Sequence, residues 1–321
     1  MKSIQVFEQF YNDELKDSIL ALETLRKRRS KKLSKILLSF VLASILVLFA
    51  IYGPVEDINV RTIIIIVAII SFLAVTTVFT HKINELNYKS RFKAELIRPI
   101  IHFISEDLVY KPQNKISEND FKKSRLFLQK HSIYEGDDFV IGTIDKTKFH
   151  FSELHVQKEN NDKNRTKSTV FKGLFFIADF NKDFEGSTVL IPSNQIGGFT
   201  FFKKLYGITR REKLVKLEDP KFSKLFTCYS DDDIKARYIL SPALMKRILD
   251  FKKKYPRNKV YISFVDSRLN IAISFSRNLL EPAYFNTLAN FNMIKAYYED
   301  IKFVVDIVDD LNLNTRIWSK K

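Results

Sequence analysis

Three consecutive aspartates form the densest cluster of residues that could do chemistry in this 321-residue chain. Asp231, Asp232 and Asp233 could bind a divalent cation or supply an acid and a base for hydrolysis. Ser230 precedes Asp233 by three positions, and apolar residues follow at helical spacing, which is also the pattern of a helix start. We favour this capping interpretation, in which the carboxylates accept hydrogen bonds from free backbone N–H groups. A hydrolase or metal-dependent enzyme that uses Asp231 to Asp233 is the alternative.

The histidines and the single cysteine give no stronger sign of a reactive site. His150 and His155 lie five residues apart in one predicted strand, so a regular strand places them on opposite faces, where they cannot share a metal ion. Cys228 lies in an apolar stretch with no base beside it, which predicts a buried thiol. The glycine motifs of phosphate loops and nucleophile elbows do not occur in the sequence. We therefore predict no catalytic residue, no cofactor and no metal site.

Aromatic and basic residues alternate in residues 199–213, directly after Gly197-Gly198. This composition is typical of a segment in a bilayer interface, where rings enter the apolar region and cations meet phosphate. The plainer interpretation is that the rings pack into the domain core and the cations are solvated, and both interpretations stay open. The membrane-interface candidates are Phe199, Phe201, Phe202, Lys203, Lys204, Tyr206, Arg210 and Arg211.

Two uncharged apolar runs, residues 36–55 and 62–80, dominate the first third of the chain. Each has about the 20 residues that a helix needs to cross a hydrocarbon core of roughly 30 Å. The connecting residues 56–61 are polar. We therefore expect a multi-pass protein of the cell membrane, anchored by a two-helix transmembrane hairpin.

Basic residues flank this predicted hairpin. Seven of the ten residues from Arg26 to Lys35 are Lys or Arg, and more cations follow the second run. Because positive charge marks the cytoplasmic side, we predict that both termini are cytoplasmic and that an anionic inner leaflet is a partner. The net charge of +16 could also attract nucleic acid. We rank nucleic acid second, because much of the excess charge flanks the apolar runs.

Helical periodicity appears on both sides of the apolar runs, at residues 4–25 and 81–108, with a break or kink expected near Pro99. The two amphipathic arms could pair as an antiparallel stalk. Ser117 and Asp120 have the pattern of a capped short helix that extends to about Gln129.

Beyond residue 138 the pattern becomes that of strands, with two clear helices near the C-terminus. Strands without regular alternation with helices predict an α+β fold with a mainly antiparallel sheet. The predicted strands are 139–144, 148–157, 169–178, 188–191, 213–217, 225–229, 260–265 and 269–275, and the helices are 243–254 and 290–311. The predicted organisation is an amphipathic helix with a basic segment (1–35), transmembrane helix 1 (36–55), an external loop (56–61), transmembrane helix 2 (62–80), an amphipathic helical arm (81–110) and a cytoplasmic α+β domain (111–321).

Two sequence blocks, E-D-P-x-F at 218–222 and A-R-Y-I-L-x-P at 236–242, are specific in combination. Together with residues 171–175 and 262–264, they resemble an uncharacterised bacterial family catalogued as domain of unknown function 3137. The resemblance implies a bacterial membrane protein with two membrane helices before the domain, and it supplies no activity. Lys235 stands where the family pattern has Glu or Gln. The family-motif residues, to which we assign structural roles, are Phe171, Gly173, Phe175, Glu218, Asp219, Pro220, Phe222, Asp233, Ala236, Arg237, Tyr238 and Pro242.

Within this motif, Arg237 could pair with Glu218 or Asp219 and so tie a strand to a helix. For the whole chain we expect a non-enzymatic, membrane-anchored interaction or envelope-associated scaffold module. Its expected partners are other membrane or envelope proteins, and a homo-oligomer stays open. Apart from the enzyme, the remaining alternative is a protein that binds anionic lipid or nucleic acid through its basic surface.

Overall fold

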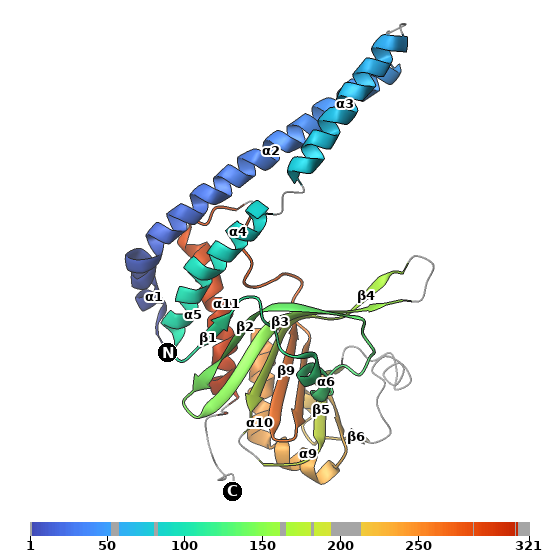
Figure 1. The fold of residues 1–321 in the computed structure, drawn as a ribbon. Coiled ribbons are helices and arrows are strands. Elements are labelled where there is room, and N and C mark those ends of the chain that lie inside the picture. The colour runs from blue at the N-terminus through green and yellow to red at the C-terminus, as the bar shows by residue number, and fades with distance from the viewer. Residues whose placement is uncertain are drawn as a thin grey trace. The chain divides into compact units, whose positions relative to one another are not determined.

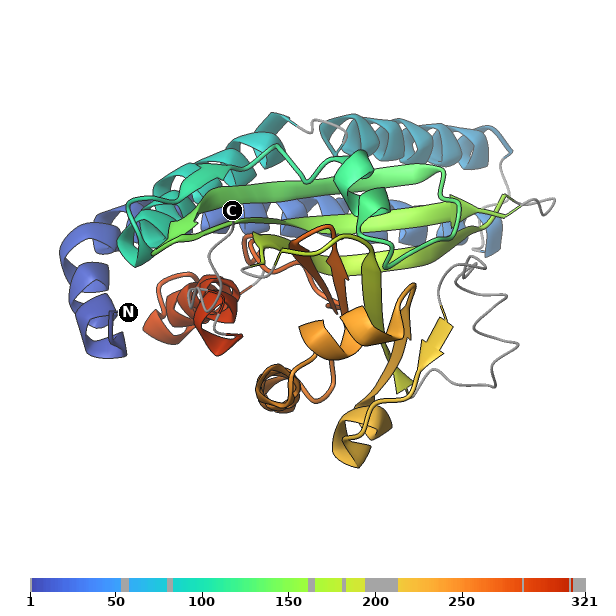
Figure 2. The same cartoon turned by 90° about the horizontal axis from the view of Figure 1, so that it is seen from below.

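The computed structural model describes residues 2–52, 58–79, 83–160, 165–180, 183–193, 213–284, 286–311 and 313. The chain divides into two compact units. The helical unit consists of Met1–Ile100 and Glu281–Ala296, and the sheet unit consists of Ile101–Leu280 and Tyr297–Lys321. Figure 1 and Figure 2 show the elements of each unit.

The first arm of the helical unit is helical from Ile4 to Tyr52. It comprises α1 (Ile4–Phe10), the π-helical segment η1 (Tyr11–Leu15) and α2 (Lys16–Tyr52). The Ser3 side chain caps α1 by accepting a hydrogen bond from the Val6 N–H group. The predicted helix at 4–25 is thus confirmed, and most of its apolar positions are buried. The fully buried ones are Phe7, Leu15, Ile19 and Leu22.

The second arm follows α3 (Ile58–Phe79). It comprises α4 (Ile83–Phe92), the π-helical segment η2 (Lys93–Ile97) and α5 (Arg98–Ile104). The predicted irregularity near Pro99 is confirmed, because η2 lies directly before this proline, which has no N–H group to donate to the helix. Both α4 and η2 contact α2, so the two arms pack on each other within the helical unit.

No helix in the described part of the chain combines the length and the apolar character that crossing a membrane requires. The predicted transmembrane hairpin at 36–55 and 62–80 is therefore wrong. The predictions of a cell-membrane location and of cytoplasmic termini, which rest on that hairpin, are wrong with it. The helix boundaries differ from those predicted, since α2 includes the basic residues 26–35 and α3 includes Arg61.

A buried ion pair joins residues 281–296 to α2. The Arg26 guanidinium donates to both carboxylate oxygens of Glu23, from Nε at 2.8 Å and from Nη2 at 2.7 Å. The same carboxylate accepts the Leu288 N–H at 3.0 Å, and Arg26 also donates to the Tyr284 carbonyl at 3.5 Å. The hydrogen bond from Arg26 lowers the pKa of Glu23 to about 2, although burial opposes this shift. Arg26, one cation of the predicted lipid-facing segment, therefore has a structural role.

The sheet unit is built on an antiparallel sheet, which confirms the predicted sheet type. In the described residues the strand order is β1-β2-β3-β4-β9-β8-β5-β7-β6. Every predicted strand is present, and β1 is an additional strand that the sequence pattern does not reveal. The strands are β1 (Val109–Lys111), β2 (Ile133–Ile144), β3 (Thr147–Glu159), β4 (Lys167–Asp179), β5 (Ser187–Pro192), β6 (Lys213–Val215), β7 (Phe226–Ser230), β8 (Val260–Val265) and β9 (Arg268–Ser274).

A tight turn joins β8 to β9. Val265 pairs with Arg268, and the two residues between them, Asp266 and Ser267, have φ values of 46° and 61°. Two consecutive left-handed residues are the geometry that suits a two-residue hairpin. Polar residues that tolerate positive φ therefore set the register of these two buried strands.

Four helices, each with a side-chain cap at its N-terminus, and part of a longer helix complete the described sheet unit. α6 (Glu118–Lys123) is capped by Ser117 as predicted but ends before Gln129. The others are α8 (Pro220–Leu225), α9 (Asp233–Ile239) and α10 (Pro242–Lys254), and α11 (Phe291–Asp310) has its C-terminal part in this unit.

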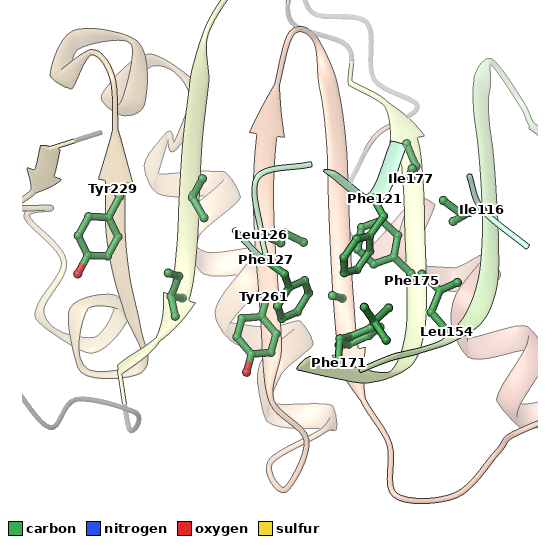
Figure 3. Packing of buried hydrophobic residues seen from close by; sticks show 14 residues of the cluster. Ile116, Phe121, Leu126, Phe127, Leu154, Phe171, Phe175, Ile177, Tyr229 and Tyr261 are labelled. Carbon is green, nitrogen blue, oxygen red and sulfur yellow. The ribbon is translucent and has the colours of Figure 1, made fainter. Parts of the chain in front are cut away.

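Both faces of the sheet are buried in its central strands. Every residue of β5 and β8 is buried, so other parts of the protein cover both faces of these strands. On one face the rings of Phe121 and Phe175 meet at 5.2 Å, which brings α6 against β4 (Figure 3). Phe127, from the segment after α6, packs against Tyr261 of β8 at 5.0 Å.

Candidate functional site

Asp232 is the residue that caps α9. Its carboxylate accepts hydrogen bonds from the N–H groups of Ile234 at 2.8 Å and Lys235 at 3.1 Å. The capping interpretation of the acidic cluster is confirmed, but the cap is Asp232 rather than Ser230. Asp233 lies in the first turn of the helix, where its negative charge faces the positive end of the helix dipole.

Asp231 and Ser230 connect the start of α9 to β5. The Asp231 carboxylate accepts the Ser187 N–H at 2.9 Å, and the Ser230 hydroxyl donates to the Ser187 carbonyl at 2.9 Å. The same hydroxyl accepts the Asp232 N–H at 3.2 Å. Two of the three carboxylates are thus engaged by backbone groups, which leaves them poorly placed for metal binding or hydrolysis.

The cysteine and the histidine pair behave as their positions in the sequence predict. Cys228 is buried in β7, and burial raises the pKa of its thiol to about 12, so it is not a nucleophile at neutral pH. In β3, His150 pairs with Ile141 and Ile177 while His155 pairs with Glu135 and Lys172, at an odd separation. The two imidazoles therefore lie on opposite faces of the sheet.

The E-D-P-x-F block builds the start of α8. The Asp219 carboxylate accepts the N–H groups of Lys221 at 2.8 Å and Phe222 at 3.1 Å. Pro220 occupies the first turn, where it loses no hydrogen bond, and Phe222 is fully buried. The spacing of this block is explained by the cap at Asp219, the proline in the first turn and the buried ring of Phe222. Glu218 is exposed.

The second block shapes α9 and the start of α10. Ala236 is fully buried, and Ser241 and Pro242 provide the cap and the first turn of α10. Arg237 donates to the Lys216 carbonyl at 3.3 Å, so it joins a helix to the segment after β6 through a backbone oxygen rather than a carboxylate. Tyr238 is 45% exposed.

The upstream motif lies in the centre of the sheet. Phe171 and Phe175 belong to the buried aromatic cluster shown in Figure 3. Gly173 has a φ of +146°, and a Cβ atom there would lie 2.1 Å from the Ile273 carbonyl oxygen. Only glycine fits where β4 meets β9 so closely.

The membrane-interface candidates from Phe199 to Arg211 lie outside the described residues, so their role stays a prediction.

A hollow of about 310 Å³ lies at the end of β3 that carries His155. The cross-strand row of Glu135, His155 and Lys172 lines it, together with Glu153 and Arg277. The Glu153 carboxylate accepts the N–H groups of two backbone residues after β9, and Arg277 pairs with Asp300 at 2.7 Å. Glu153 and Arg277 thus have structural partners, and the charged groups of this hollow are of both signs, so they select no ligand class.

Large apolar side chains are exposed along α2 and α3. The two helices contact each other, with Ala43 buried and the rings of Phe40 and Phe72 meeting at 5.7 Å. Many other apolar side chains of the two helices are exposed among those whose burial the structure describes. Four of those on α2 are each more than half exposed and repeat at intervals of four and three residues; they are Leu38, Leu42, Ile45 and Phe49.

The same spacing continues upstream into basic residues. Arg28, Lys31 and Lys35 are exposed and stand at intervals of three and four, leading to Leu38 after three more. A repeat that averages 3.5 residues keeps side chains on one side of a helix, as in a coiled-coil seam. We call these seven residues the α2 stripe: Arg28, Lys31, Lys35, Leu38, Leu42, Ile45 and Phe49. This spacing can be read from the sequence. It was overlooked because residues 36–55 were predicted to span a membrane.

Residues 169–313 match the model of a family described as Protein of unknown function (DUF3137). The resemblance to this family is confirmed. The DUF3137 region extends from β4 through α11, so both motif blocks lie inside it and the α2 stripe lies outside it.

No curated protein matches the chain significantly. Among solved structures, the chain is similar to the crystal structure of the mycobacterial trehalose monomycolate transport factor A, TtfA. That similarity has 11% identity, covers 69% of this chain and 96% of that one, and gives a TM-score of 0.32. A likeness at this level supports no statement about function.

Proposed function

We propose that this chain is a non-catalytic interaction module that docks onto a partner protein through the α2 stripe. The observation that carries this proposal is the exposed apolar surface of α2 and α3. Folded proteins rarely leave contiguous apolar patches above a few hundred Å² in water, and larger ones mark interaction sites. Besides the stripe, this surface contains Leu37, Val41, Leu48, Val60, Ile63, Ile66, Val67, Ile69, Ile70 and Leu73.

The stripe also defines the chemistry of the partner. Its apolar half fits the apolar face of another helix, and Arg28, Lys31 and Lys35 extend the same line with positive charge. Within the described residues no carboxylate contacts these three cations, in contrast to Arg26, which pairs with Glu23. The partner is therefore a helix whose apolar face continues into acidic side chains.

A second copy of this chain fits the stripe less well. Two stripes side by side in parallel would bring their basic ends together, and like charges in contact oppose association. The enzyme alternative is weaker as well, because Asp231 and Asp232 already accept backbone N–H groups.

Site-specific photo-crosslinking in the native cells tests the proposal. A photoreactive residue at Leu42 or Ile45 should crosslink to one partner protein, and the same residue at Val109, which is 52% exposed in β1, is the matched control. Mass spectrometry of the crosslinked peptide should identify an apolar helical segment that ends in Asp or Glu. The double variant Lys31→Glu, Lys35→Glu should remove the crosslink.

Three results would contradict this proposal. They are crosslinks only to a second copy of the chain, crosslinks only to lipid, and crosslinks that survive the double charge reversal. Crosslinking to lipid or to nucleic acid would favour the alternative in which the basic surface binds a polyanion.

A further inference from the structure

Positive charge is concentrated on α10 (Figure 1) and on the residues that follow it. Residues 242–259 contain seven Lys or Arg and one acidic residue, a net charge of +6, against +16 for the whole chain. One side of α10 is buried through residues such as Leu244, Ile248 and Phe251. A helix turns by about 100° per residue, so the exposed cations of α10 all lie on the opposite side. We call these four residues the α10 basic face: Lys246, Arg247, Lys253 and Lys254.

The cations in the last turn of α10 have structural partners. Lys252 donates to three backbone carbonyls that follow the helix, at 2.8 to 3.0 Å. Lys253 pairs with Asp250 at 2.8 Å, and Lys254 pairs with Asp310 of α11 at 2.7 Å. Because the helix dipole favours positive charge at a C-terminus, the fold itself explains these three lysines.

Lys246 and Arg247 have no such explanation. They lie in the N-terminal half of α10, where the helix dipole gives cations no advantage. Both side chains are exposed, and no carboxylate contacts either of them within the described part of the chain. The same holds, among the described residues, for Arg257 and Lys259, which follow the helix. These four exposed cations therefore have no counter-charge from the described chain.

Asp250, the acidic residue on this side of α10, indicates the sign of the local potential. The hydrogen bond from Lys253 lowers the pKa of Asp250, and the charges of Lys246 and Lys254 lower it further. No carboxylate of the described residues is among the causes of this shift, although the neighbouring α11 contains acidic residues. The face therefore attracts anions.

The composition of the face indicates which kind of anion it suits. Interfaces between proteins have an apolar core, yet none of the exposed large apolar side chains belongs to residues 242–259. Stable binding to a bilayer likewise needs an apolar anchor beside the basic residues. Interfaces with nucleic acid, in contrast, are polar and strongly positive. The α10 basic face therefore fits phosphates of nucleic acid better than a protein or a membrane.

Two observations favour a duplex over a single strand. Proteins that bind single strands stack bases on aromatic side chains, but Phe251 is buried and Tyr255 packs against Phe303 at 4.1 Å. The seven residues from Lys246 to Lys253 extend over about 10.5 Å of helix. A duplex has one charge per roughly 1.7 Å of its axis, so about six phosphates occupy that length.

We propose that the α10 basic face binds the phosphate backbone of double-stranded nucleic acid without reading its sequence. Lys246 and Arg247 provide phosphate contacts that serve no structural purpose within the sheet unit. The face shares no residue with the α2 stripe, so the two surfaces can be tested separately. Nothing in the DUF3137 match assigns a partner to these residues.

Fluorescence anisotropy of the full chain with a short labelled DNA duplex tests this proposal. Two duplexes of unrelated sequence should bind with Kd values within about threefold of each other, and both should bind more weakly as the salt concentration rises. The double variant Lys246→Glu, Arg247→Glu should weaken binding by at least about tenfold at 0.1 M salt. It should also reduce the slope of log Kd against log salt concentration by about two, one for each lost phosphate contact.

The double variant Lys158→Glu, Lys167→Glu is the matched control. These two exposed lysines lie on β3 and β4, and their reversal changes the net charge by the same amount. The control should weaken binding by no more than about threefold, because salt screens distant charges. Circular dichroism of each variant confirms that the fold is retained.

Three results would overturn the proposal. They are a duplex that does not bind, a loss of binding that is no larger in the Lys246→Glu, Arg247→Glu variant than in the control, and a loss in that variant confined to vesicles of anionic lipid while duplex binding is unchanged.

Discussion

The two halves of α2 belong to one unbroken helix but differ in the burial of their apolar side chains. Before Lys27, Ile19 and Leu22 are fully buried and Arg26 is paired with Glu23. After Lys27, Arg28, Lys31 and Lys35 are exposed, and Leu42 and its neighbours remain in contact with solvent. Within the described residues, the first half of the helix thus has buried apolar side chains and an ion pair, whereas the α2 stripe is exposed. This difference in burial is the observation on which the proposed docking of a partner on the α2 stripe rests.

The central strands of the sheet unit give the sharpest contrast, because their apolar side chains are covered on both faces. Phe175→Ala, in the buried aromatic cluster, should lower the free energy of unfolding by about 3–5 kcal/mol. Leu42→Ala, in the α2 stripe, should change it by no more than about 0.5 kcal/mol. Urea unfolding followed by circular dichroism measures both, and similar losses for the two variants would remove the contrast.

The buried pair in the first half of α2 should show a distinct pH dependence. Because the pKa of Glu23 falls from 4.5 to about 2 on folding, its charged form stabilises the helical unit by about 3 kcal/mol. This contribution is complete above pH 4.5 and disappears as the pH falls through about 2. Glu23→Gln should therefore cost about 3 kcal/mol at pH 7 and almost nothing at pH 2. A cost that does not change between these pH values would contradict the role of the ion pair.

The helix cap at Asp232 should have a smaller effect. Asp232→Ala should cost about 1 kcal/mol, while Asp232→Asn should cost only a few tenths, because Asn caps nearly as well. Asp233→Asn should change the stability no more than that. Thermal unfolding of the three variants measures these losses of stability. A larger loss for Asp233→Asn than for the Asp232 variants would favour the helix start predicted from Ser230 and Asp233 over the cap at Asp232.

Local signals predicted the sheet unit well. The apolar stretches at 260–265 and 269–275 predicted β8 and β9. Strand β1 was missed because three residues are too few to show a period. Helix α8 was missed although Asp219 and Pro220 carry its start signal, since only six residues follow.

The prediction of a transmembrane hairpin in the helical unit failed because it considered the uncharged runs apart from the residues that flank them. Residues 36–55 were taken as one element because they lack charge, whereas α2 begins at Lys16 and includes the basic segment. The partners of Glu23 and Arg26 in residues 281–296 are distant in the sequence, so no local pattern could reveal them. Residues 199–213 stay a prediction, as almost all of them lie outside the described part of the chain.

The accessibility of the α2 stripe in the cell tests the central claim most directly. A cysteine at Leu42 can be followed with a maleimide, because the natural Cys228 is buried and its thiol has a raised pKa. The account predicts that Leu42→Cys reacts much more slowly in native cells than in the purified chain. Lys31→Glu with Lys35→Glu should restore fast labelling, and Val109→Cys should react equally in both settings. Equal labelling of Leu42→Cys in cells and in the purified chain, or protection that survives the charge reversal, would contradict docking of a partner protein on the stripe.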